Sequence, residues 1–146
     1  MRAATPNLEE TAVIEPGSRA TASVVVMGGD LAGILSQVQD DAFPPVYATS
    51  RMIGLMELAA ARLMRPLLRP GELSVGVSVE IRHGAATPVG VRVDAEARFA
   101  WMEGKLFVFE VAARDAAGEI GRGMHRRAIV EEARLIRGAR QRAGLG

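Results

Sequence analysis

Apolar and polar residues alternate strictly in the second half of the chain, as they do in strands that bury one face. The clearest alternation places apolar side chains at every second position of one segment: Leu73, Val75, Val77, Val79 and Ile81. Further strands are predicted over residues 88–101, 106–113 and 120–130, and short turns that contain Gly104 and Gly118 join them. Four successive strands with short connections predict an antiparallel sheet, one face of which needs a cover.

Helical periodicity replaces this alternation over residues 49–65. Thr49 or Ser50 supplies an N-cap, and Pro66 ends the helix. One stripe of this helix is apolar: Met52, Leu55, Met56, Ala59, Ala60 and Leu63. Because no other predicted element is large enough to cover the sheet, the sequence predicts an α+β hotdog fold, in which a curved antiparallel sheet wraps around one long central helix.

The first 48 residues carry weaker signals. A first strand is predicted over either residues 11–14 or residues 20–27. Asp30 is expected to cap a short helix that runs to about residue 37, and residues 38–47 are expected to form an irregular loop.

Length and composition favour one domain without metal or disulfides. The chain has 146 residues, of which 49% are hydrophobic, so it is long enough to build one core. We expect a single domain over residues 1–146, with a loose lead-in over residues 1–10 and a C-terminal helix and tail over residues 131–146. The lack of cysteine excludes a thiolate nucleophile and thiolate metal sites, and two histidines exclude a three-histidine site within one chain. No metal or other cofactor is expected.

The charge balance argues against a dedicated nucleic-acid binder, because 18 basic residues face 17 acidic ones. Most of the arginines in the C-terminal third are interpreted as a solvated, ion-paired surface. The chain has no run of 18 apolar residues and no signal-peptide pattern at its start, so we expect a cytoplasmic protein without membrane partners.

Glu57 is the exception on the long predicted helix, because it lies away from the arginines and among apolar neighbours. Ile53, Ala60 and Met64 flank it along its face. A carboxylate in such surroundings is costly unless it is paired. Glu57 is therefore either a functional carboxylate or a rim carboxylate that pairs with an arginine of a neighbouring strand.

Thr49 and His83 are the other candidate functional residues. Thr49 lies two turns before Glu57 and has an ordinary role as an N-cap, although free N–H groups there also suit a developing oxyanion. His83 shares the parity of the alternating apolar residues, so it is expected to face the helix, either as a hydrogen-bonded core residue or as a catalyst. His125 is interpreted as structural. Gly76 marks a strand position that a ligand or another backbone can approach closely.

Several motifs at consistent spacing resemble the fluoroacetyl-CoA thioesterase family. They are Tyr47-Ala48-Thr49, Met52-Ile53-Gly54-Leu55-Met56-Glu57, Arg69-Pro70-Gly71-Glu72, His83-Gly84-Ala85-Ala86-Thr87-Pro88-Val89-Gly90 and Glu119-Ile120-Gly121-Arg122-Gly123-Met124-His125-Arg126-Arg127-Ala128. The likeness runs from about Phe43 to Val130, whereas the first 35 residues match poorly.

This resemblance implies a hotdog-fold homodimer that hydrolyses short acyl-CoA thioesters with a threonine, a glutamate and a histidine. Those catalytic roles fall on Thr49, Glu57 and His83. The resemblance also implies that Gly76 and Arg127 bind the substrate at the thioester. We further expect Arg127 to be a candidate for binding the pantetheine or the phosphates. Glu57 acts either as a nucleophile that forms an anhydride or as the base for water.

An aromatic gate over the pocket is implied at Phe43. The fluoroacetyl-specific pattern has a second aromatic residue three positions earlier, where this chain has Asp40. A charged residue there weakens the case for an apolar lid that selects a fluorinated methyl group.

The sequence therefore predicts hydrolysis of a short-chain acyl-CoA to the free acid and CoA. The alternative is a non-catalytic acyl-CoA-binding hotdog protein, in which the same residues only shape the ligand site. A third hypothesis is a structural hotdog dimer that serves as an interaction module.

Overall fold

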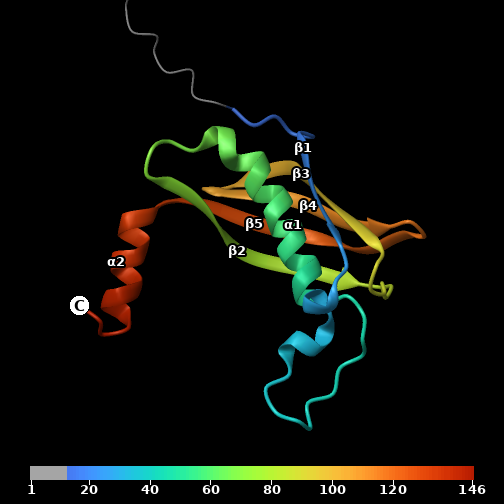
Figure 1. The fold of residues 1–146 in the computed structure, drawn as a ribbon. Coiled ribbons are helices and arrows are strands. Elements are labelled where there is room, and N and C mark those ends of the chain that lie inside the picture. The colour runs from blue at the N-terminus through green and yellow to red at the C-terminus, as the bar shows by residue number, and fades with distance from the viewer. Residues whose placement is uncertain (1–12) are drawn as a thin grey trace, which may run out of the picture.

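A curved antiparallel sheet wraps around one long helix in the computed structural model, which describes residues 13–146 (Figure 1). The five strands are β1 (Arg19–Val25), β2 (Glu72–His83), β3 (Arg92–Glu103), β4 (Leu106–Asp115) and β5 (Gly118–Glu131). Their order in the sheet is β1-β3-β4-β5-β2, and every neighbouring pair is antiparallel. The helices are α1 (Thr49–Met64) and α2 (Glu132–Arg142). The predicted α+β architecture is confirmed.

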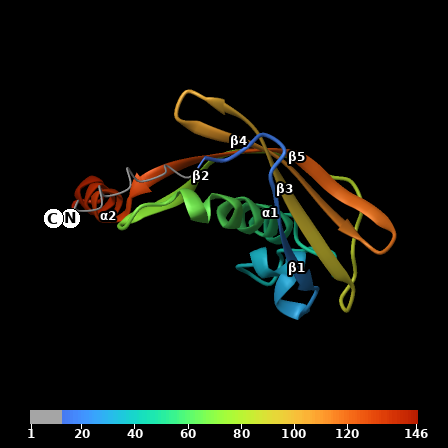
Figure 2. The same ribbon diagram turned by 90° about the horizontal axis from the view of Figure 1, so that it is seen from above.

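Helix α1 lies along the concave face of the sheet, as the view from above shows (Figure 2). Its buried side chains are Met52, Leu55, Met56, Ala59, Ala60 and Met64. The predicted stripe is thus confirmed except at its end, where Met64 is buried and Leu63 is only partly buried. The sheet contributes the alternating residues of β3, including Val93 and Phe99, and each large apolar side chain buried here contributes about 1.5–3 kcal/mol.

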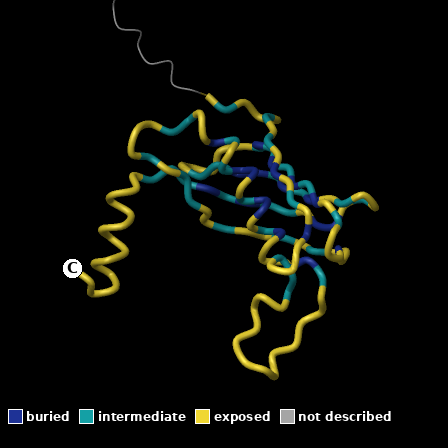
Figure 3. Tube along the Cα trace, in the orientation of Figure 1, coloured by how far each residue is buried: buried dark blue, intermediate teal, exposed yellow. Residues whose placement is uncertain are grey.

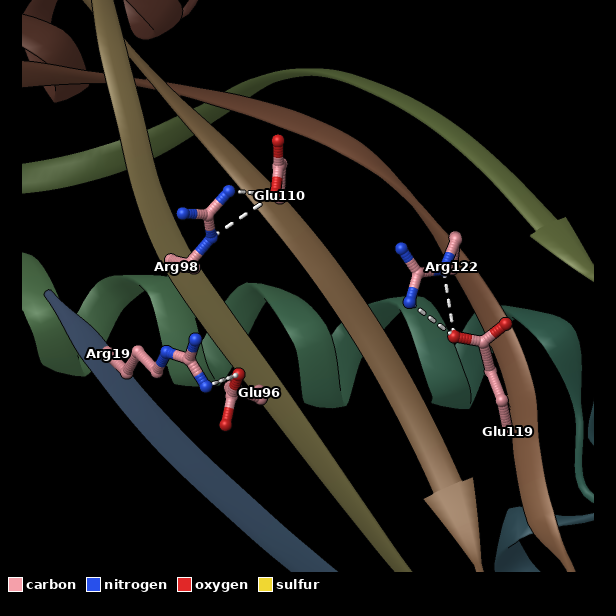
Figure 4. A network of polar contacts seen from close by, with 6 residues as sticks. All are labelled: Arg19, Glu96, Arg98, Glu110, Glu119 and Arg122. Atoms are coloured by element: carbon pink, nitrogen blue, oxygen red, sulfur yellow. Dashed lines mark hydrogen bonds and ion pairs between the residues drawn. The ribbon is translucent and has the colours of Figure 1, made fainter. Parts of the chain in front are cut away.

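The convex face of the sheet is polar and carries ion pairs between neighbouring residues (Figure 4). Arg19 Nη1 lies 3.4 Å from Glu96 Oε1, and Arg122 Nη2 lies 2.7 Å from Glu119 Oε1. Arg98 pairs with Glu110 between β3 and β4. Such exposed pairs contribute about 0–1 kcal/mol each, so this face is a solvated surface, as expected for most of the arginines.

Strand β2 does not keep one alternation along its length. A β-bulge between Gly76 and Ser78 inserts one residue relative to β5. After the bulge His83 faces α1, as predicted, but before it Gly76 faces α1. Leu73 and Val75 were predicted to face α1 together with Ile81 and His83. This prediction is wrong, because one inserted residue exchanges the two faces of a strand for all residues before it.

Of the two predicted first strands, the structure contains the second. Strand β1 pairs with β3 from Arg19↔Arg98 to Val25↔Arg92. No strand covers residues 13 and 14, and the rest of the other candidate lies outside the described residues, as does the expected lead-in over residues 1–10.

The predicted short helix after Asp30 is wrong. The chain instead forms two 3-10 helices, Gly28–Asp30 and Ala32–Leu35, which Leu31 separates in an extended conformation. The Asp30 carboxylate accepts a hydrogen bond from the Met27 N–H at 2.9 Å, so it caps the turn before it and not a helix after it.

Residues 32–46 form an exposed loop that leads into α1, and we call it loop 32–46. Ala32 N–H donates to the Val46 carbonyl at 2.9 Å, and Leu31 pairs with Tyr47 beside it, so the neck of the loop is closed. Tyr47 N–H donates to the Thr87 carbonyl at 2.8 Å, which ties the neck to the chain after β2. The loop therefore has a defined position at the start of α1.

Helix α2 forms over nearly the predicted residues and stands off the sheet near the start of β2 (Figure 1). It buries none of its side chains. In the part of the chain from residue 13 onward, no helix is long and apolar enough to cross a membrane.

Candidate active site

Thr49 and His83 meet where the start of α1 reaches the end of β2. Thr49 Oγ1 and His83 Nδ1 share a hydrogen bond of 2.8 Å. The N-cap of α1 is Ala48, and no side chain caps the helix, so the prediction that Thr49 or Ser50 supplies the N-cap is wrong. The Thr49 hydroxyl is instead engaged by the histidine. His83 Nε2 is buried and has no hydrogen-bond partner among the described residues. With Nδ1 held by threonine, Nε2 is the ring nitrogen left to exchange a proton.

Glu57 lies on the rim of the sheet's concave face and pairs with Arg127 of β5. Arg127 Nη1 is 3.5 Å from Glu57 Oε2, and the side chains are 7% and 43% exposed, respectively. Burial lowers the pKa of Arg127, and the Glu57 carboxylate partly opposes this shift. Glu57 thus has the ion pair that the structural interpretation required, and it still offers solvent-accessible carboxylate surface to a ligand.

Ser74 of β2 holds the guanidinium of Arg127 in place. Arg127 Nε donates to Ser74 Oγ at 3.1 Å, and Arg127 Nη2 donates to the Ser74 carbonyl at 2.9 Å. A guanidinium engaged in this way has little surface left for a phosphate. The structure therefore favours a role for Arg127 in orienting Glu57 over contact with the CoA phosphates, and its role toward substrate stays a prediction.

His125 extends this network behind Arg127. His125 Nδ1 lies 2.9 Å from the Ser78 carbonyl, which can only accept, so Nδ1 carries the proton. The unprotonated Nε2 then accepts a hydrogen bond from Arg127 Nη1 at 3.1 Å. Burial lowers the pKa of His125, and the Arg127 charge lowers it further, against opposing effects of the Ser78 carbonyl and Glu57. His125 is therefore a neutral histidine that supports Arg127.

Gly76 leaves the space in which these side chains meet. A Cβ at this position would lie 3.2 Å from Glu57 Oε2 and 3.2 Å from His125 Cε1, closer than ordinary van der Waals contact. The close approach expected at Gly76 is thus made by the carboxylate and the imidazole of the same chain. A contact of Gly76 with a thioester stays a prediction.

The structure does not bring the three predicted catalytic residues together within one chain. Thr49 and Glu57 are eight residues apart on α1, which corresponds to about 12 Å along the axis at 1.5 Å per residue. His83 joins Thr49, whereas Glu57 joins Arg127 and Gly76. Residues 13–146 contain no group of three or more His, Cys, Asp or Glu side chains that could hold a metal ion.

Phe43, the predicted gate, lies in loop 32–46. Its side chain is 43% exposed, and Asp40 beside it is exposed as well. Because the loop leads directly into Thr49, it lies on the side of the molecule where a gate is expected. Its gating role stays a prediction.

The contacts that His125, Ser74 and Ser78 make around Arg127 were not predicted from the sequence. The signal for His125 was present, because His125 and Arg127 are two residues apart on one strand and therefore point to the same face. For Ser74 there was no such indication in the sequence. The strict alternation placed Ser74 on the face opposite His83, and only the bulge turns it to the same face.

The lowered pKa of His125 predicts a pH-dependent stability. Unfolded His125 takes up a proton near the ordinary pKa of about 6.5, whereas folded His125 does so only at lower pH. The unfolded state therefore binds more protons below about pH 6.5, and the free energy of unfolding falls as the pH drops. One such group gives a slope of at most about 1.4 kcal/mol per pH unit. Urea unfolding between about pH 5.5 and 7.5 measures this slope.

The His125→Gln variant is the matched control, because glutamine does not titrate in this range. We expect its stability to be lower than that of the wild type at pH 7.5, with a flatter pH dependence. Equal slopes for both proteins would show that His125 is not the responsible group.

The region that contains these residues matches a known protein family. The chain matches the family described as fluoroacetyl-CoA-specific thioesterase over residues 33–133. That range contains all six predicted site residues: Phe43, Thr49, Glu57, Gly76, His83 and Arg127. A fluoroacetyl-CoA thioesterase from Streptantibioticus cattleyicolor is 41% identical over 104 residues, which cover 71% of this chain and 75% of that protein.

Solved structures show the same fold. A structure of the fluoroacetyl-CoA thioesterase FlK matches with a TM-score of 0.84 at 36% identity, over 89% of this chain and 98% of that one. A thioesterase superfamily member from Thermus thermophilus matches with a TM-score of 0.80 at 31% identity, over 92% and 98% of the two chains. A hot-dog-like protein from Thermanaerovibrio acidaminovorans, 23% identical, has a TM-score of 0.76. The predicted hotdog fold is confirmed.

Proposed function

This chain belongs to the fluoroacetyl-CoA-specific thioesterase family, and from that membership we infer that it is a thioesterase that hydrolyses short-chain acyl-CoA to the free acid and CoA. The hydrogen bond between Thr49 and His83, which lies within the matched region, is the observation that supports assigning this function to particular residues. No observation favours the alternative of a non-catalytic acyl-CoA-binding protein.

We propose that Glu57 and His83 divide the chemistry of the thioester. Glu57 either attacks the acyl carbon or takes a proton from a water molecule that attacks it. In the first case the carbon–sulfur bond breaks to leave an anhydride on Glu57, which water then hydrolyses to the free acid and the free carboxylate. In the second case the attack of water and loss of the thiolate give the free acid directly. His83 supplies the proton that the departing thiolate takes up, and Thr49 holds the imidazole in position. The free N–H groups of the first turn of α1 are suited to the developing oxyanion, and one such donor is worth about 3 kcal/mol.

We further propose that the enzyme is a homodimer, in which Glu57 of one protomer works with Thr49 and His83 of its partner. The separation of about 12 Å along α1 keeps these residues of one chain from acting on one acyl carbon. Strand β2 forms one edge of the sheet, and Val77 and Val79 on it are 53% and 42% exposed. A long apolar edge strand of this kind is a template for pairing with another strand. Antiparallel pairing of the β2 strands of two protomers would bring Glu57 of one protomer toward Thr49 and His83 of the other.

Release of free CoA thiol from acetyl-, propionyl-, longer acyl- and fluoroacetyl-CoA tests the proposed function. We expect turnover of the short esters, and Asp40 next to the Phe43 gate disfavours a strong preference for fluoroacetyl-CoA. Thermal stabilisation by CoA esters without thiol release would instead establish the non-catalytic alternative. A cytoplasmic location stays a prediction.

The same assay tests the shared site through mixed dimers of the inactive variants Glu57→Gln and His83→Ala. If the site combines two chains, each mixed dimer holds one intact site, so random mixing restores about a quarter of wild-type activity. No recovery after verified subunit exchange would show that each site lies within one chain.

A further inference from the structure

Helix α2 has an apolar side that no other segment of the described residues 13–146 covers. Leu135 and Ile136 are 43% and 52% exposed. A groove between α2 and the end of β5 is lined by Ile129, Val130, Leu135 and Ala139. A helix with an apolar stripe is stable in water when that stripe packs against another surface. This side of α2 is therefore a candidate interface.

Loop 32–46 is also exposed along most of its length, as the burial colouring shows (Figure 3). Its exposed large apolar side chains are Ile34, Leu35, Val38 and Phe43. Because its neck is closed by hydrogen bonds, the loop presents these side chains from a defined position. It forms a second uncovered apolar surface of this fold.

The two segments carry opposite charge. Helix α2 has four arginines and one glutamate, whereas loop 32–46 has two aspartates and no basic residue. The backbone N–H groups of Gln37 and Val38 lower the pKa of Asp41, which keeps its carboxylate charged. Opposite charge beside apolar side chains on both surfaces is the complementarity expected of partners in one interface.

Helix α2 and loop 32–46 lie at opposite ends of β2. Glu131, directly before α2, pairs with Glu72 at the start of β2. The loop leads into Thr49, which contacts His83 at the end of β2. Figure 1 shows α2 and the loop projecting from the sheet at separate ends of this strand. A two-fold axis that pairs two β2 strands antiparallel places the start of one beside the end of the other. It therefore places α2 of one copy beside the loop of the other.

We propose that α2 is an arm that packs against loop 32–46 of a second copy of this chain, and so forms one wall of the entrance to the Thr49–His83 site of that copy. This inference rests on the homodimer proposed above. It gives α2 a role in the site even though α2 lies far from Thr49 in its own chain. The arginines of α2 then stand next to the entrance through which the polyanionic CoA moiety arrives.

The absence of cysteine from the sequence allows a direct test by disulfide crosslinking. Val38→Cys combined with Ile136→Cys places one thiol on the loop and one on α2. After mild oxidation we expect more than about half of the chains to run as covalent dimers on a non-reducing gel, because a disulfide forms only when the two Cα atoms come within about 7 Å. The matched control combines Ile136→Cys with Glu110→Cys on the convex face, and we expect little covalent dimer from it.

The possible outcomes separate this inference from the proposed function. Mass by light scattering and thiol release are measured on each variant before oxidation, and Leu35→Cys with Leu135→Cys is the second pair if the first fails to fold. If the protein is an active dimer and neither cysteine pair crosslinks, the proposed packing of α2 against the partner's loop is wrong, whereas the proposed thioesterase function stands. A faster-running covalent monomer would show that the loop contacts its own α2, which also overturns the arm. A monomeric protein overturns the dimer and the arm together, while its thiol release still reports on the proposed function.

Discussion

Replacing Glu57 by glutamine lowers kcat for hydrolysis of acetyl-CoA or propionyl-CoA by about 10³-fold, within the range expected for loss of a general base. Glutamine keeps the size of the side chain and an oxygen that can accept from Arg127, but it can neither take a proton from water nor attack the acyl carbon. Because Arg127 is held by Ser74 as well, the fold around it is expected to persist. Steady-state thiol release measures the loss, and the melting temperature checks the fold.

Glu110→Gln is the matched control, since Glu110 lies on the convex face and pairs with Arg98 there. We expect it to keep wild-type kcat. Wild-type turnover by Glu57→Gln would exclude both proposed roles of Glu57, and Glu57 would then be only the rim carboxylate that pairs with Arg127.

Replacing Gly123 by alanine is expected to lower the free energy of unfolding by about 3 kcal/mol or more, at the upper end of the costs of overpacking. A Cβ at position 123 would overlap the carbonyl group of Glu80 in β2 and would lie 2.9 Å from Ile81 Cα. Both are main-chain groups, so a change of rotamer cannot relieve the overlap, and β2 has to move away from β5. Urea unfolding measures the loss.

Gly54→Ala is the matched control, and it is expected to raise the free energy of unfolding measured in the same urea experiment. Gly54 lies on the exposed side of α1, where an added Cβ has no neighbour within 4 Å. Alanine in a helix interior is more favourable than glycine by about 0.5–1 kcal/mol, so this variant is expected to be stabilised. A Gly123→Ala protein as stable as the wild type would mean that β2 and β5 are farther apart at this position.

Local patterns were sufficient for most of the elements. The period of the apolar residues predicted α1 and four of the five strands, because a helix and a strand each bury one face at a characteristic spacing. Patterns of this kind are local, so they fail where a single residue changes the register. The bulge between Gly76 and Ser78 is such a case, and it reversed the expected face of Leu73.

The sequence indicated which residue types could take part in the chemistry of the site, but not which of them are in contact. Thr49 has the sequence context of an N-cap, and cap preference depends only on adjacent residues. What engages its hydroxyl is His83, 34 residues away, and that contact depends on how β2 crosses the start of α1. His125 was interpreted as structural, and its supporting contact with Arg127, behind Glu57, became visible only in the folded chain.

The sequence by itself determined the fold class, the face of α1 that is buried and the family resemblance on which the thioesterase function rests, because each depends on the identity and spacing of nearby residues. Only the tertiary structure decided which functional residues meet. It paired Thr49 with His83 and Glu57 with Arg127, and it placed the two pairs in separate positions along α1. The physical reason is that such contacts are set by the curvature and register of the sheet, to which residues far apart in the chain contribute together.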